Sequence, residues 1–116
     1  MPRFLAVYTM KPEDLAGFRA RPKAEQDALD DAGLKQWVDW STANAAAIVD
    51  PGLMVGKTMR VTRDGVAEAA NPFCGYVVVE AETIEDAARL FTKHPHFTVF
   101  PGDGVDIMPV VTGPET

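Results

Sequence analysis

The segment Gly75-Tyr76-Val77-Val78-Val79-Glu80-Ala81 predicts a strand that is apolar on both faces, and it decides the fold. Consecutive valines cannot alternate between a buried and a wet face, as the residues of a half-exposed strand do. The strand leads into a short helix and then into His94-Pro95-His96, which holds both histidines of the chain. Because one layer of helices covers only one face of a sheet, we expect a second copy of the sheet to cover the other. This predicts a homodimer.

The other predicted elements surround this strand in an order typical of one fold. A short helix is expected between Pro12 and Pro22, and the turn Arg63-Asp64-Gly65 is followed by an expected loop over 66–71. The main elements are a strand over 3–10, a long helix over 24–49, a half-exposed strand over 54–63, the apolar strand over 73–81, a helix from 83 that ends before Pro95, and a last strand over 105–111. The order predicts an α+β, ferredoxin-like βαββαβ fold in a single domain over residues 1–116.

Composition narrows the classes of partner. The chain has 116 residues, a formal net charge of -6 and one cysteine, Cys74. A negative protein offers no positive field to phosphates or to an anionic lipid surface, so neither nucleic acid nor a membrane is an expected partner. The sequence opens directly on a strand-like segment, which favours a cytoplasmic location. A single cysteine excludes an internal disulfide, and Cys74 is expected to be a small buried apolar residue.

The two histidines are the candidates for acid/base chemistry. With an ordinary pKa near 6.5, His94 or His96 would exchange protons at neutral pH, oriented by a carboxylate such as Asp39, Asp50 or Asp106. The structural alternative has His94 capping the end of the preceding helix and His96 packing against a neighbouring aromatic ring. A metal is not expected, because a His-Pro-His tripeptide lacks the spacing at which histidines converge on one ion.

Aromatic residues supply candidate walls for a ligand site. Trp37 and Trp40 lie three residues apart on the long predicted helix, and Tyr8 and Tyr76 lie on the two strands expected at the centre of the sheet. They would line a pocket for a planar or apolar ligand, with Asn44 as a further polar contact. The alternative is ordinary core and sheet packing, since large aromatic residues dominate both.

Short motifs spread over most of the chain also resemble a known family. They are Trp37, Trp40, Ile48-Val49-Asp50-Pro51-Gly52, Gly75-Tyr76, Glu80-Ala81, Ala87-Ala88, His94-Pro95-His96 and Val105-Asp106-Ile107-Met108-Pro109. Together they are similar to the YCII-related (YciI-like, DGPF-containing) family of small bacterial proteins. The resemblance implies a dimeric α+β barrel, an architecture also used by muconolactone isomerases and small cofactor-free monooxygenases. The family's Asp-Gly-Pro-Phe segment is matched only by Asn71-Pro72-Phe73, and no histidine precedes His94, so no catalytic residue is carried over.

Two main interpretations of function follow. One is a cofactor-free enzyme that does acid/base chemistry on a small organic metabolite, because no nucleotide-binding, serine hydrolase or metalloprotease motif occurs in the sequence. It requires a concave site in which a carboxylate lies within about 3.2 Å of a histidine, directly or through one water. The other is a non-catalytic small-molecule binding or accessory dimeric protein. A purely structural dimer module is a third.

Overall fold

A four-stranded antiparallel sheet forms the centre of the molecule in the computed structural model, which describes residues 1–111. Its strands lie in the order β2 (Ile48–Asp50), β5 (Phe73–Glu80), β1 (Arg3–Thr9) and β6 (Gly104–Pro109). The two central strands are therefore the first and third of the sheet in chain order, as in a ferredoxin-like fold. The predicted α+β class is confirmed.

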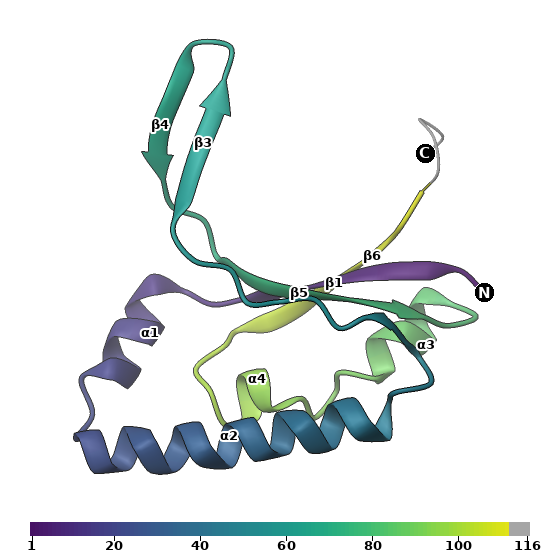
Figure 1. Cartoon of the computed structure of the whole chain (residues 1–116), viewed down its shortest axis with the longest axis horizontal. Coiled ribbons are helices and arrows are strands. Elements are labelled where there is room, and N and C mark those ends of the chain that lie inside the picture. Colours follow the sequence, from purple (N-terminus) through teal and green to yellow (C-terminus); the bar gives the residue numbers. More distant parts are fainter. Residues whose placement is uncertain (112–116) are drawn as a thin grey trace.

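The helices lie on one side of this sheet (Figure 1). They are α1 (Pro12–Arg19), α2 (Lys23–Ala43), α3 (Ile84–Arg89) and α4 (Pro95–Thr98). Proline begins α1 and α4, where its missing N–H costs nothing. The Thr83 hydroxyl begins α3 by accepting a hydrogen bond of 3.1 Å from the N–H of Asp86.

The long predicted helix is shorter than expected at its carboxyl end. It ends at Ala43, where the Trp40 carbonyl accepts two hydrogen bonds from Asn44, one from the backbone N–H at 3.0 Å and one from the side-chain amide at 2.9 Å. The helix runs through Gly33 without a break. The Phe100 ring lies against this glycine, in the space that a Cβ atom would need.

The predicted second strand was assigned to the wrong residues. The sheet strand is β2, which follows directly after α2, whereas β3 (Thr58–Thr62) and β4 (Gly65–Ala69) pair only with each other. This hairpin rises from the side of the sheet opposite the helices (Figure 1). Residues 66–71 are therefore largely strand and not the expected loop. The alternating pattern of 54–63 indicates a strand, but it does not indicate which strand it pairs with.

The hydrophobic core lies between the sheet and the helices. Phe4, Ala6 and Tyr8 of β1 and Val77 and Val79 of β5 face it, and all five are buried. From α3 and the segments on either side of it, Ala81, Ala87 and Phe91 complete the cluster. The core thus holds the inner side of the central strands against the helix layer.

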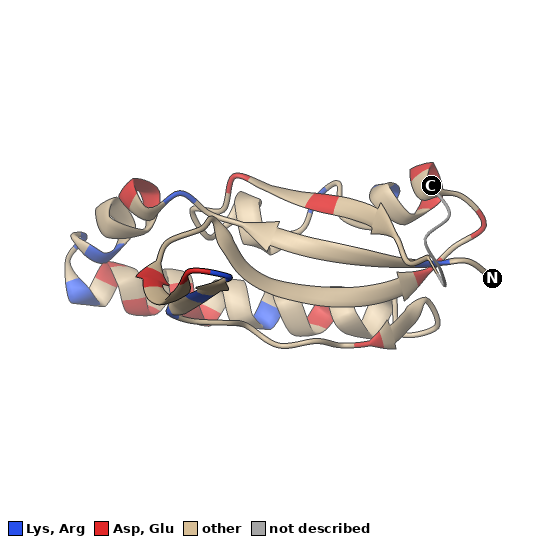
Figure 2. Ribbon diagram, turned by 90° about the horizontal axis from the view of Figure 1, so that it is seen from above, with Lys and Arg blue, Asp and Glu red and all other residues tan. Residues whose placement is uncertain are grey.

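The opposite side of the sheet is also apolar, and we call it the outward face. Leu5 pairs with Val78 and with Met108, and Val7 pairs with Tyr76, so these five side chains share that face. Val7 is only 5% exposed, whereas Met108 is 41% exposed. The strands carry few charged residues, which are concentrated on the helices and connecting segments (Figure 2). Within residues 1–111, no helix is long and apolar enough to cross a membrane.

Candidate functional site

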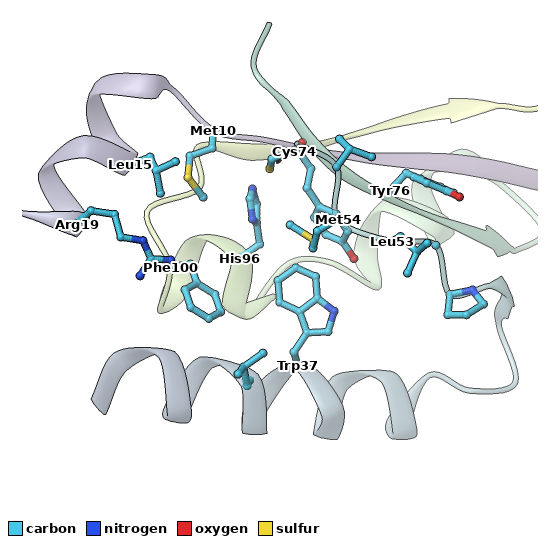
Figure 3. A pocket seen from close by; sticks show the side chains of 15 residues that line it. Met10, Leu15, Arg19, Trp37, Leu53, Met54, Cys74, Tyr76, His96 and Phe100 are labelled. Carbon is cyan, nitrogen blue, oxygen red and sulfur yellow. Dashed lines mark hydrogen bonds between the residues drawn. The ribbon is translucent and has the colours of Figure 1, made fainter. Parts of the chain in front are cut away.

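A cavity of about 510 Å³ lies beside one end of the sheet, between α1, α2, α4 and the segment after β2 (Figure 3). Its volume is within the range of about 300–1,000 Å³ that is usual for small-molecule sites. Aromatic, aliphatic and sulfur-containing side chains predominate among the residues that line it. They are Tyr8, Met10, Leu15, Arg19, Leu34, Trp37, Pro51, Gly52, Leu53, Met54, Val55, Cys74, Tyr76, His96 and Phe100.

His94 is buried behind the cavity and has a defined hydrogen-bond direction. Its Nδ1 atom accepts a bond of 3.0 Å from the backbone N–H of His96, which makes it the N-cap of α4 and not a cap on the preceding helix. A neutral imidazole that accepts at Nδ1 carries its hydrogen on Nε2. Nε2 lies 3.3 Å from the Tyr8 hydroxyl and therefore donates to it. The hydroxyl hydrogen of Tyr8 remains free for another acceptor.

His96 lines the cavity, and its hydrogen-bond partner also determines which ring nitrogen carries the hydrogen. Its Nε2 atom lies 2.7 Å from the carbonyl oxygen of Thr9, which can only accept, so Nε2 carries the hydrogen. Nδ1 then holds the lone pair, and it has no hydrogen-bond partner within residues 1–111. His96 and Tyr8 both line the cavity, although each residue is at most 2% exposed.

Burial sets the charge state of both rings. It lowers the pKa of His94 from 6.5 to about 3, with a smaller contribution from the charge of His96. It also lowers the pKa of His96, against the opposing effects of the Thr9 hydrogen bond and the Asp103 charge. Burial raises the pKa of the Tyr8 hydroxyl. The lowered pKa values contradict the expectation of an ordinary histidine pKa near 6.5, and neither ring takes up a proton from water at neutral pH.

The carboxylates expected to orient a histidine lie elsewhere. Asp39 is on the exposed side of α2, where it pairs with Lys35 at 3.2 Å. Asp50 accepts a bond of 2.8 Å from the N–H of Gly52, and Asp106 is exposed on β6. Within the described residues, no hydrogen bond joins any carboxylate to a histidine, so the direct carboxylate contact expected for an enzyme is not present.

A different acid stands next to His96. Asp103 accepts a bond of 2.7 Å from the Thr9 hydroxyl, and its N–H donates to the same Thr9 carbonyl that His96 contacts. Its charge is the one that favours protonation of His96. Sequence reasoning missed this residue, because Thr9 and Asp103 are 94 positions apart and meet only through the pairing of β1 with β6.

The aromatic candidates divide into two groups. Trp37, Tyr8 and Tyr76 line the cavity, but the Tyr76 side chain lies on the outward face and its hydroxyl points away from His96 (Figure 3). Trp40 and Asn44 do not, since the Trp40 indole donates to the Leu90 carbonyl at 2.7 Å and its ring packs on Phe91 in the core. Trp37 stands perpendicular to the His94 ring, with 4.3 Å between the ring centroids.

Comparisons with known proteins show a similarity of fold. No family model matches the sequence, and no curated protein matches it either. Among solved structures, the chain is similar to 5-chloro-2-hydroxyhydroquinone dehydrochlorinase (TftG) from Burkholderia phenoliruptrix AC1100, in complex with 2,5-dihydroxybenzoquinone. The TM-score is 0.54 and the identity is 13%, over 96% of this chain and 95% of that one. The two chains share a fold.

Cys74 lines the cavity, although the sequence favours a purely structural residue. Its Sγ atom donates to the Tyr8 carbonyl at 3.2 Å. Burial raises its pKa, with a smaller effect from Asp103, so the side chain is a thiol at neutral pH and not a nucleophilic thiolate. No group of three or more histidine, cysteine, aspartate or glutamate side chains that could hold a metal ion occurs in the described part of the chain.

Proposed function

We propose that the chain is a cofactor-free enzyme that moves a proton on a small organic molecule bound in this cavity. The observation that carries the proposal is the unpartnered Nδ1 atom of His96, a residue that lines a mostly apolar cavity together with Tyr8. A base that is uncharged at neutral pH can accept a proton without first losing one. The resemblance to the YCII-related family and the shared fold with an enzyme agree with this proposal.

Two groups beside His96 partly offset the burial that disfavours the charged form created by proton transfer. When Nδ1 takes a proton from an acidic O–H or C–H group, Nε2 keeps its bond to the Thr9 carbonyl, and the nearby Asp103 carboxylate stabilises the imidazolium. Tyr8 donates its free hydroxyl hydrogen to an oxygen of the same substrate, supported from behind by His94. His96 is the proposed base and Tyr8 the proposed hydrogen-bond donor.

We also propose that the protein works as a homodimer whose outward sheet faces pack against each other. The paired residues Leu5 and Val78 lie at the centre of this apolar surface, and the β3–β4 hairpin rises on the same side (Figure 1). Two sheets that pack face to face bury such surfaces in a layer about 10 Å thick. This arrangement is the α+β barrel that the resemblance implies.

A panel of hydroxylated single-ring phenols and quinones, including 2,5-dihydroxybenzoquinone, tests the enzyme proposal by changes in their absorption spectra. We expect the wild type to convert at least one compound, and His96→Asn to lose about a hundredfold or more in rate while still binding it. Asp27→Asn, a change at an exposed ion pair with Lys23, is the matched control and keeps full activity.

The mostly apolar wall of the cavity supports a second candidate, a non-catalytic binding protein. Compounds that bind without conversion, equally well to the wild type and to His96→Asn, would favour this alternative. If no compound of the panel binds, both functions fail.

A further inference from the structure

Arg19 is the charged member of the cavity wall. The other lining residues are apolar or uncharged polar at neutral pH, since His96 has a lowered pKa and no carboxylate is among them. The chain as a whole carries a net charge of -6, so its overall field repels anions. A single cation in an otherwise uncharged cavity therefore distinguishes anionic ligands from uncharged ones.

The guanidinium group is held in place from one side only. Its Nη1 atom contacts Asp30 at 3.2 Å and Gln26 at 3.5 Å, and its carbon atom lies 5.0 Å from the centre of the Phe18 ring. The Gln26 amide also donates to the Arg19 carbonyl at 2.9 Å and fixes the backbone at the end of α1. Nη2 and Nε have no acceptor within residues 1–111. A guanidinium group with free donors matches the geometry of a carboxylate or a similar oxyanion.

The arrangement of the cavity places this cation at a distance from the proposed base. Arg19 and Phe100 lie at one end, and His96 stands between them and Trp37 (Figure 3). We propose that Arg19 binds the anionic group of the ligand, which makes the ligand class an apolar or aromatic organic anion. The apolar body of such a molecule would extend past Phe100 toward Trp37 and bring its reacting group to His96. This inference rests on the proposed ligand cavity.

A pair of fluorescent probes that differ in a single charged group tests the inference. The probes are 1-anilinonaphthalene-8-sulfonate and its uncharged parent, N-phenyl-1-naphthylamine, titrated into the intact protein. We expect Arg19→Gln to weaken binding of the sulfonate about tenfold, which is the loss of one charge-assisted contact, and to leave the uncharged probe unchanged. Added NaCl should weaken the sulfonate alone.

Two further variants distinguish an effect of the Arg19 charge from an effect of Arg19 on local packing. Arg21→Gln is the matched control, since Arg21 also lies over the Phe18 ring, at 5.9 Å, but pairs with Glu25 and is not part of the cavity wall. Asp30→Asn removes the same ion pair as Arg19→Gln but keeps the cation. We expect both to bind the sulfonate at least as well as the wild type.

These measurements distinguish failure of the anion site from failure of the ligand cavity itself. If Asp30→Asn weakens the sulfonate as much as Arg19→Gln does, Arg19 acts through the packing of α1 on α2, and the anion site is overturned. If Arg19→Gln changes both probes equally or changes neither, the anion site is also overturned, although the apolar cavity stands. If neither probe binds the wild type, the ligand cavity itself is overturned together with this inference.

Discussion

The imidazole ring of His96 occupies the space that a Cβ atom on Gly102 would need. The backbone N–H of Gly102 also donates to the His96 carbonyl at 2.9 Å, so neither residue can shift without disturbing the other. We predict that Gly102→Ala displaces the ring, strains its bond to Thr9 and lowers the free energy of unfolding by about 1–3 kcal/mol. Urea denaturation checks this value.

Gly17 is the matched glycine for that experiment. It lies in the exposed interior of α1, with no atom near the position of an added Cβ. Gly17→Ala should therefore stabilise the protein by up to about 1 kcal/mol, through the better helix propensity of alanine. Equal effects of the two substitutions would show that His96 is free to move, which contradicts the packing described above.

The stability of the protein should depend on pH through its buried histidines. Below pH 6.5 an unfolded chain protonates His94, whereas the folded chain resists protonation until the pKa of His94, about 3. The unfolded state thus binds more protons, and stability is fully present above pH 6.5 and decreases as the pH falls toward 3. We expect a loss of up to about 1.4 kcal/mol per pH unit from this residue, measured by urea denaturation between pH 7.5 and 4.5.

His94→Asn is the variant that isolates this effect. An asparagine oxygen can replace Nδ1 as the acceptor for the N–H of His96, and it does not titrate. The variant should be less stable at pH 7.5 but should lose less stability on acidification. The same pH slope in the variant and the wild type would mean that His94 is not the source of the dependence.

The two tryptophans should differ in what their indole N–H groups contribute. Trp40 donates to the Leu90 carbonyl at 2.7 Å, so Trp40→Phe leaves that carbonyl without its partner. The Trp37 indole has no such acceptor in the described residues. We predict that Trp40→Phe costs about 1 kcal/mol more stability than Trp37→Phe, and that only Trp37→Phe weakens binding of N-phenyl-1-naphthylamine. A larger loss of stability for Trp37→Phe would contradict this division into core and cavity residues.

The fold class could be predicted from the sequence because strong local patterns set it. The apolar run 75–81, the capping residue Thr83, and prolines that bound helices at Pro12 and Pro95 each act within a few residues. The short helix α4, which starts at Pro95, was not predicted. The edge strand β2 could not be predicted in this way. It has three residues, too few to show an alternating pattern, and it directly follows a helix.

The candidate site was predictable only as far as residue type reveals it. Tyr8, Trp37 and His96 are large or titrating side chains, so they are obvious candidates wherever they lie. Their charge states depend on packing, since the His94 ring is enclosed by aromatic rings from α2 and from the segment after α3. Asp103 has no local signal, because its role depends on strand pairing between the two ends of the chain.

Val78 provides the test of the proposed dimer, because it lies opposite Leu5 on the outward face. A lysine there would remain hydrated in a monomer but would place an unpaired charge inside a sheet-to-sheet interface, which costs several kcal/mol. We expect the wild type to sediment as a dimer and Val78→Lys to sediment as a folded monomer with an unchanged circular dichroism spectrum. Val38→Lys is the control, since Val38 is 64% exposed on α2, away from that face, and this variant should remain dimeric. A dimeric Val78→Lys, or a monomeric wild type at micromolar concentration, would rule out association through the outward face.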